Sequence, residues 1–582
     1  MNFKLAMTLK ELKHRTSKQT YKAVKLLSPE SREVKRLSVD DMLVLCYLTR
    51  AAKKFDEVHL KLEHPQNIQF LEFLNSEIEN GNQKAVLTKR LFESQKSMFS
   101  PDALGNQTVL AKDVKELAGM NYFPADLTVE EFHKILNQML DDGELQEVAN
   151  ILNQRTVVKR DGEKLKAIDF VDEFSEFQEA ANELKKALKH STDKKFNKFL
   201  ELQIKALENA DPMLDAEADK AWAKLDGGKF EFTITRECYD EKLTKSIHEN
   251  KELFERLKNA GVTVYAKDSL GARVGLVNKA GTKLLKRLKG LVSIAKNLMP
   301  YKNEYEQGTE KNEFSQTAVD VDIVTLTGEE GAYQAGIVVA QNLPNDDKLA
   351  LLIGGGRRNV YHRQIRKRTN KKLYKNLINS EQFKFFNQEA DHWGVICHEN
   401  THSLGPKSHA SLGKHSAIME EFKADMGIYA FLKDFVKEGL FSDFQAKQIV
   451  LTNLVKSFLK GKPNIKQDHR VRSVMICARM LFEKAIVFDD ERKLKIDFEK
   501  AILTAKTMLA EVVRLQIDKD VQGAGDYIKK WFVWTPEMEE VATTIKKHSK
   551  ILNGYLVSEL ADEFLNPNFE KTLKDKEWFL VF

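Results

Sequence analysis

The spacing of hydrophobic residues changes twice along the chain. From the start to about residue 220, apolar residues recur at helical spacing, as in LTVEEFHKILNQML (127–140). Thr128 stands at the N-cap position of that segment, and Glu131, three residues later, completes a capping-box pattern. This part of the chain is therefore predicted to be helical.

After residue 228 the spacing becomes that of a strand. Phe230, Phe232 and Ile234 alternate with polar residues, which is typical of a half-buried strand. Short apolar runs predict further strands at 261–266, 321–326 and 335–343. From about residue 380 the helical pattern returns.

This order predicts a mainly helical α+β protein with two lobes. We expect a mainly helical N-terminal region at 1–220, a smaller β-containing lobe at 221–345, and a helical lobe with C-terminal helices at 346–582.

Composition limits the class of protein. The 582 residues are 42% hydrophobic and 31% charged, which indicates a folded globular chain. Its four cysteines form no CxxC pair, so neither a disulfide framework nor a thiolate zinc site is indicated. Neither a signal-peptide core nor an apolar run long enough to cross a membrane is present, so a cytoplasmic location is expected.

The basic run GGGRRNVYHRQIRKRTNKKLYK (354–375) is the main candidate for nucleic-acid binding. It lacks the GK[ST] of a phosphate loop, and aromatic residues within it are few. The net charge of +6 is also modest. We interpret the run as a solvated helix face with one arginine directed toward a cleft, and nucleic acid is not an expected partner.

The segment HENTH (398–402) carries the clearest chemistry. On a helix, His398 and His402 lie one turn apart on the same face, where both can bind one metal ion. Glu399 between them is placed to take a proton from a water molecule. The alternative is a helix that carries two histidines without a metal.

A hydrolytic zinc site needs a third protein ligand. Glu421 fits this role, because a loop rich in Gly, Pro and Ser can return a second helix to the first. Asp425, one turn later, would hold the second ring nitrogen of a ligand histidine. Glu420 would do the same for the other histidine, or be the ligand itself. His409 and His415 are interpreted as loop histidines near the metal.

HENTHSLGP followed by HSAIMEEFKAD resembles the dipeptidyl peptidase III family of zinc peptidases, and especially its divergent bacterial and plant branch with a compact HExxH. The segments GMNYFPADLTVEEF (119–132) and QNLPNDDK (341–348) are similar to further family motifs. The resemblance covers most of 115–560. It implies a wide cleft between a helical zinc-binding lobe and the β-containing lobe, one Zn²⁺ per chain and a short peptide as substrate.

The resemblance also implies roles for residues outside the HENTH helix. In TITRECYDEKL, Glu237 would bind the amino terminus of the substrate and Tyr239 would stabilise the oxyanion. His469 matches the family's transition-state histidine. The family's arginine one turn later falls on Ser473, with Arg472 displaced by one residue.

Together these features predict a zinc metallopeptidase that cleaves near the N-terminus of short peptides. One alternative is a metallohydrolase that acts on a non-peptide amide or ester. The other is a catalytically silent member that binds peptides or a partner protein. No membrane partner is expected, and the chain is expected to be a monomer or a homodimer.

Overall fold

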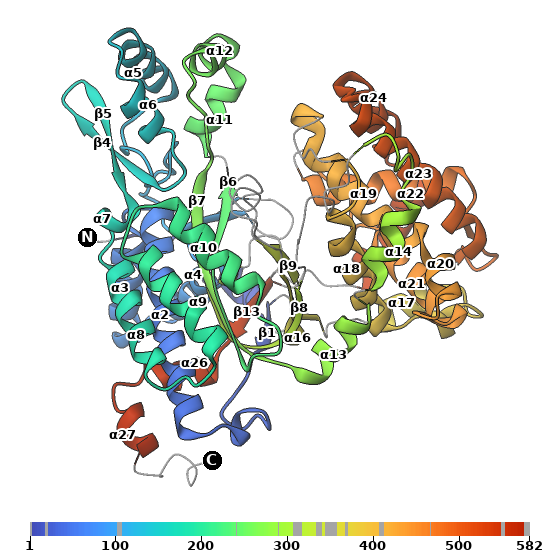
Figure 1. Cartoon of the computed structure of the whole chain (residues 1–582), viewed down its shortest axis with the longest axis horizontal. Coiled ribbons are helices and arrows are strands. Elements are labelled where there is room, and N and C mark those ends of the chain that lie inside the picture. Colours follow the sequence, from blue (N-terminus) through green and yellow to red (C-terminus); the bar gives the residue numbers. More distant parts are fainter. Residues whose placement is uncertain are drawn as a thin grey trace.

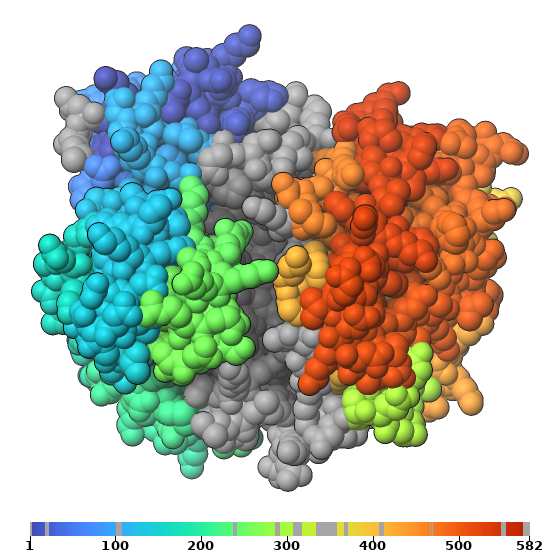
Figure 2. Space-filling view, turned by 90° about the horizontal axis from the view of Figure 1, so that it is seen from above, coloured from blue at the N-terminus to red at the C-terminus, as the bar shows by residue number. Residues whose placement is uncertain are grey.

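The computed structural model divides the chain into two lobes, each with its own hydrophobic core (Figure 1). The sheet lobe has a core drawn from 24–276, 319–365 and 560–573, and the helical lobe has one drawn from 285–299 and 361–545. Figure 2 shows a hollow between them. The structure describes residues 3–17, 21–101, 107–239, 241–288, 290–305, 317–332, 340–343, 358–366, 371–406, 412–465, 467–548 and 553–574.

A five-stranded sheet forms the centre of the sheet lobe. Its strands run in the order β6–β7–β8–β10–β9, and β8 and β10 are parallel whereas the other neighbours are antiparallel. The strands are β6 (Phe230–Tyr239), β7 (Lys267–Val277), β8 (Thr317–Gly328), β9 (Ala340–Leu343) and β10 (Arg358–His362).

The N-terminal helices share a core with this sheet. The longest, α2 (Val39–Glu63), packs against β7 and β8, and α8 lies along α2. The other helices of this lobe are α5 (Val129–Asp141), α6 (Leu145–Ile151), α7 (Phe170–Glu173), α8 (Glu176–Leu188), α9 (Lys194–Leu207), α10 (Pro212–Ala223), α11 (Lys242–Glu249) and α12 (Lys251–Asn259). Beside them, α1 (Leu9–Arg15), α3 (Asn67–Glu79) and α4 (Gln83–Gln95) enclose a smaller third core.

The helical lobe holds α14, which lies between β7 and β8 in the sequence, and the helices from α17 to α25. Within it, α19 packs against α18, α22 and α23, and so lies near the centre. Its helices are α14 (Gly290–Leu298), α17 (Lys371–Leu377), α18 (Gln388–His402), α19 (Ser416–Ala430), α20 (Leu432–Lys437), α21 (Asp443–Lys456), α22 (Asp468–Phe482), α23 (Phe498–Asp518), α24 (Val521–Trp531) and α25 (Pro536–His548).

The chain returns to the sheet lobe at its end. Strand β13 (Asn553–Val557) pairs in parallel with β1 (Tyr21–Lys25), and α26 (Glu559–Leu565) packs against α2. The helical lobe is therefore inserted between elements of the sheet lobe. Among the described residues, none of the helices combines the length and the apolar character needed to cross a membrane.

Three of the predicted strands coincide with observed ones, and one is wrong. The runs 230–235 and 321–326 lie in β6 and β8. Of 335–343, only 340–343 is described, and it forms β9. The run 261–266 precedes the strand, which is 267–277. The strand KDSLGARVGLV was obscured because it carries buried charges and two glycines, whose added Cβ atoms would lie within 3 Å of β8.

Two smaller predictions are also corrected. Thr128 does cap α5, since its hydroxyl accepts a hydrogen bond from the amide of Glu131 at 3.2 Å. The Glu131 carboxylate binds Arg160 instead of closing a capping box. In the basic run, Arg358 belongs to the buried strand β10, where it pairs with Glu231 at 3.1 Å, so this part is no solvated helix face.

Candidate metal centre

The HENTH motif lies at the end of α18, which packs closely on α19. An added Cβ at Gly427 of α19 would lie 1.9 Å from the hydroxyl oxygen of Thr401. On the other side of α18, a Cβ at Gly394 would lie 2.3 Å from the side chain of Asn453 on α21. Because only glycine allows this approach, the two glycines fix how far α18 lies from its neighbours.

Three potential ligand atoms converge between α18 and α19. The Nε2 atoms of His398 and His402 are 3.1 Å apart, and their rings are perpendicular. The Glu421 carboxylate oxygens lie 3.5 Å from Nε2 of His398 and 3.7 Å from Nε2 of His402. These side chains are only 12–19% exposed. Among the described residues, they form the one group of His, Cys, Asp and Glu with atoms close enough to share a metal ion.

The outer nitrogen of each ring is bound by a different carboxylate. Nδ1 of His398 lies 2.8 Å from Asp425, and Nδ1 of His402 lies 3.2 Å from Glu420. A carboxylate accepts a hydrogen bond, so each Nδ1 is the protonated nitrogen, and both Nε2 lone pairs face the space between the helices.

This donor set fits zinc. Ligand atoms about 2.0–2.2 Å from a shared tetrahedral zinc lie roughly 3.3–3.6 Å apart. The three observed separations, 3.1, 3.5 and 3.7 Å, lie around that range. Two Nε2 lone pairs facing each other repel unless a cation or a proton lies between them. The residues therefore form a site suited to a small divalent cation.

Two buried cations and one amide hold the carboxylates in place. Arg472 on α22 forms ion pairs with Glu421 and, at 2.9 Å, with Asp425. Gln516 on α23 donates to Glu420 at 3.1 Å, and Lys423 pairs with Glu420 at 2.8 Å. The ammonium of Lys423 also donates to the carbonyl of Leu404, which ties the loop after α18 to α19.

Sequence reasoning did not assign Arg472, Lys423 or Gln516 to the site. Arg472 was noted as displaced by one position from the expected arginine, and its place on the helix that begins with Asp468 was the available signal. Lys423 lies three residues after Glu420, and this spacing was an available signal, whereas nothing in the spacing marks Gln516.

The pairings also shift proton affinities. Burial by itself would lower the pKa of His398, but its hydrogen bond with Asp425 and the nearby carboxylates raise it above the ordinary value. Burial would raise the pKa of Asp425, whereas Arg472 and His398 bring it below the ordinary value. The carboxylate is thus held ionised as the acceptor from His398.

For most of the other predicted site residues, the structure describes the backbone but not the side chain. Glu399 lies half-buried on α18 beside His398. His469 is on α22, and Glu237 and Tyr239 are near the end of β6, but the side chains of these three lie outside the described part.

The loop histidines and the two further motifs are described only in part. His409 and residues 344–348 lie outside the described residues. His415 packs near α24, where its Nε2 would lie 3.1 Å from a Cβ added at Gly525. Tyr122, in the 119–132 segment, is in the sheet lobe and donates to the carbonyl of Asp268 at 3.1 Å.

No protein-family model and no curated protein sequence matches the chain. Solved structures do. DPP III from Caldithrix abyssi superposes with a TM-score of 0.78 at 22% identity, over 96% of this chain and 100% of that one. Dipeptidyl-peptidase III from Corallococcus sp. strain EGB gives 0.74 at 19% identity, over 96% and 98%. The chain therefore has the two-lobed fold of dipeptidyl peptidase III structures along nearly its whole length.

Proposed function

We propose that this protein is a zinc-dependent peptidase that hydrolyses short peptides near their amino terminus. The observation that carries the proposal is the convergence of His398, His402 and Glu421, with both histidine Nδ1 atoms bound by carboxylates. The fold shared with dipeptidyl peptidase III structures supports a peptide as the substrate.

The three side chains would hold one Zn²⁺ and leave a fourth position open. Zinc bound there supplies a water molecule of lowered pKa, about 7, and polarises a carbonyl group. Asp425 and Glu420 keep both imidazoles in the tautomer that presents Nε2. Without them, a rotated ring or the wrong tautomer would remove a donor.

Glu399 would act as the general base. It follows His398 directly on α18, so its carboxylate is carried by the helix that presents both imidazoles. It would accept the proton of the attacking water and return it to the amine that leaves. This accounts for the proton at each step without a further titrating group.

The resemblance assigns the remaining roles. Glu237 would pair with the ammonium of the substrate's amino terminus. Tyr239 and His469 would donate to the oxygen that becomes negative as the peptide carbonyl is attacked. Strand β6 belongs to the sheet lobe and α22 to the helical lobe, so these groups would meet only across the hollow between the lobes (Figure 2).

The direct test is elemental analysis combined with turnover of dipeptidyl arylamides. One zinc per chain, and arylamide cleavage that a chelator abolishes and zinc restores, is the expected result. Zinc with cleavage of simple esters alone would identify a different hydrolase. Peptide binding without turnover, in protein free of metal, would identify a binding protein and overturn the proposal.

A further inference from the structure

One end of the β6–β7 strand pair carries Glu237 and Tyr239, two residues that the proposed function uses. Among the described residues, pairing of β7 with β8 stops at Gly271. Beyond it, residues 236–239 of β6 pair with 267–270 of β7 without a third described strand, and Tyr239 opposite Lys267 is the last pair. We call these residues the two-stranded end. Two strands alone are at most marginally stable in water, so this end depends on contacts with other elements.

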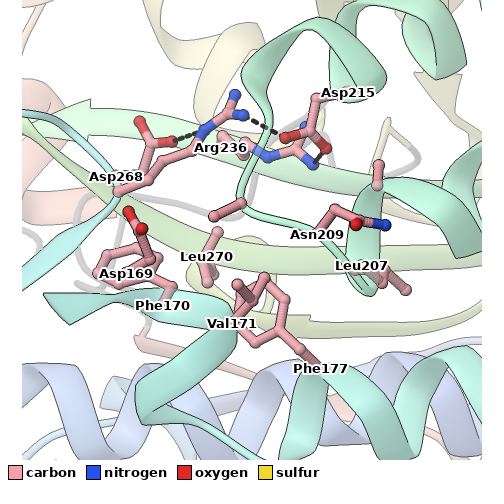
Figure 3. Close-up of a pocket in the computed structure, with 13 residues that line it drawn as sticks. Asp169, Phe170, Val171, Phe177, Leu207, Asn209, Asp215, Arg236, Asp268 and Leu270 are labelled. Atoms are coloured by element: carbon pink, nitrogen blue, oxygen red, sulfur yellow. Dashed lines mark hydrogen bonds and ion pairs between the residues drawn. The ribbon is translucent and has the colours of Figure 1, made fainter.

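Ion pairs hold the inner part of the two-stranded end. Arg155 pairs with Asp268 of β7 at 3.2 Å, and both Arg155 and Arg236 of β6 pair with Asp215 of α10 (Figure 3). Arg236 lies three residues before the last residue of β6. These ion pairs therefore join both strands to the rest of the lobe but involve neither residue of the last pair.

The ammonium group of Lys267 anchors the last pair. It donates to the backbone carbonyls of Ile151, Asn153 and Thr156 at 2.9, 2.8 and 3.0 Å, and it lies 2.9 Å from the hydroxyl of Thr156. Ile151 ends α6 and Thr156 begins β4 (Thr156–Asp161), so one side chain joins the two-stranded end to both elements. Because Lys267 is only 1% exposed, water cannot replace these acceptors.

A second fixed point follows Tyr239 along the chain. Glu241 caps α11, since its carboxylate accepts hydrogen bonds from the amides of Leu243 and Thr244 at 2.6 and 3.0 Å. Glu241 is itself only 6% exposed. Tyr239 therefore lies between Lys267, across the strand pair, and Glu241, two positions later.

We propose that Lys267 is a positioning residue of the peptidase reaction, which holds the end of β6 so that Tyr239 meets the substrate in a fixed place. This role rests on the function proposed above. A donor stabilises a developing oxyanion when it lies about 2.7–3.1 Å from it, and a displacement of about 1 Å can lower the rate about 100-fold. The hydrogens of the Lys267 ammonium are taken by the carbonyls and the hydroxyl, so Lys267 acts through the strand and not on the substrate.

The test is the kinetics of zinc-loaded variants with a dipeptidyl arylamide. Lys267→Met keeps the apolar stem and removes the donors, and we expect kcat to fall about 10–100-fold with one zinc per chain retained. The fall should largely disappear when both chains compared also carry Tyr239→Phe, because no phenol donor is then left to position. Lys229→Met is the matched control. It removes an exposed lysine that pairs with Asp41 beside the other end of β6, and it should keep the kcat of the parent.

A milder variant serves if Lys267→Met does not fold. Thr156→Val keeps the shape of the side chain and removes one acceptor of the ammonium, so kcat should fall about two- to tenfold, again only with Tyr239 present. Hydrogen exchange gives a readout that does not depend on turnover. The amides of 236–239 should exchange faster in either variant, whereas those of α18 should exchange as in the parent.

The outcomes separate this role from the proposed function. An unchanged kcat in folded Lys267→Met, an equal fall with and without Tyr239, or unchanged exchange at 236–239 would each overturn the role of Lys267 and leave the proposed function standing. A parent chain that binds zinc but cleaves no arylamide would overturn the proposed function, and this role with it.

Discussion

Arg472 of α22 pairs with Glu421 of α19, the same carboxylate that faces both histidine Nε2 atoms. It also reaches Asp425, one helical turn further along. Three carboxylates (Glu420, Glu421 and Asp425) therefore face two cations (Lys423 and Arg472), which leaves one negative charge when the imidazoles are neutral. This net negative charge favours binding of a divalent cation and disfavours binding of an anion.

Replacing Arg472 should lower the unfolding free energy of the metal-free protein more than that of the zinc-loaded protein. In Arg472→Met, two largely buried carboxylates lose their partner, which we expect to cost roughly 3 kcal/mol of unfolding free energy. Zinc at the site would neutralise Glu421 in part, so the loss should be smaller in zinc-loaded protein. Denaturant unfolding with and without zinc measures the loss of unfolding free energy in each state.

Arg492→Met is the control for that experiment, because Arg492 pairs with Glu540 at the surface. Its effect should be below about 1 kcal/mol with or without zinc. An equal loss for Arg472→Met in both states would mean that Glu421 gains nothing from the metal, and would count against its role as ligand.

Glu420 and Glu421 are neighbours in sequence but point to different partners, so isosteric substitutions distinguish them. Glu421→Gln should abolish stoichiometric zinc binding. Glu420→Gln should keep one zinc per chain, with affinity reduced about 10–100-fold, because only the support of His402 is weakened. Zinc titration against a competing chelator measures the zinc affinity of each variant. If Glu420→Gln lost zinc and Glu421→Gln kept it, Glu420 would be the ligand.

Glu399→Gln should retain zinc and lose at least about 100-fold in kcat for a dipeptidyl arylamide. The amide has nearly the shape of the carboxylate but takes up no proton from water. Glu389→Gln, near the start of the same helix, is the matched control and should be fully active. Unchanged turnover in the Glu399 variant would rule out the general-base role.

Gly427→Ala should disturb the metal centre through packing alone. The added methyl would lie 1.9 Å from the Thr401 hydroxyl, so α18 must shift relative to α19, at a cost of about 1–3 kcal/mol. His402 follows Thr401, so zinc affinity should also fall. Gly461→Ala, where no atom lies within 4 Å, should change stability by less than about 0.5 kcal/mol.

A carboxylate in the sheet lobe should make stability depend on pH. Burial and the charge of Glu330 raise the pKa of Glu329 from 4.5 to about 7. The folded chain therefore binds this proton more tightly than the unfolded chain, and the corresponding stability is lost as pH rises from about 4.5 to 7. Glu329→Gln should raise the Tm by a few degrees at pH 8 and leave it unchanged at pH 4. Equal shifts at both pH values would contradict this.

The metal centre could be largely predicted from the sequence because its information is local. The spacing of His398 and His402 fixes a common helix face, and Asp425 lies one turn from Glu421. The choice between Glu421 and Glu420 depends on the rotation of α19 about its axis. That rotation is set by the Gly427 contact with Thr401, which no spacing rule contains.

The fold class was also predictable, but the packing of the lobes was not. Strand β7 was not predicted because it lacks the apolar pattern of a core strand. Three charged residues, Lys267, Asp268 and Arg273, are buried in it, each at most 1% exposed. Lys267 is accommodated since its ammonium donates to the carbonyls of Ile151, Asn153 and Thr156. Such compensation depends on residues more than a hundred positions away.

The pairing of β1 with β13 has a consequence for biosynthesis. The partners Tyr21 and Asn553 are 532 positions apart, so at about 5–20 residues per second the ribosome needs roughly half a minute to two minutes to deliver the second after the first. During that interval β1 has no strand to pair with, and the face of α2 that α26 covers stays open to water. The nascent chain therefore exposes this surface of α2 and the edge of β1 until β13 and α26 have been made.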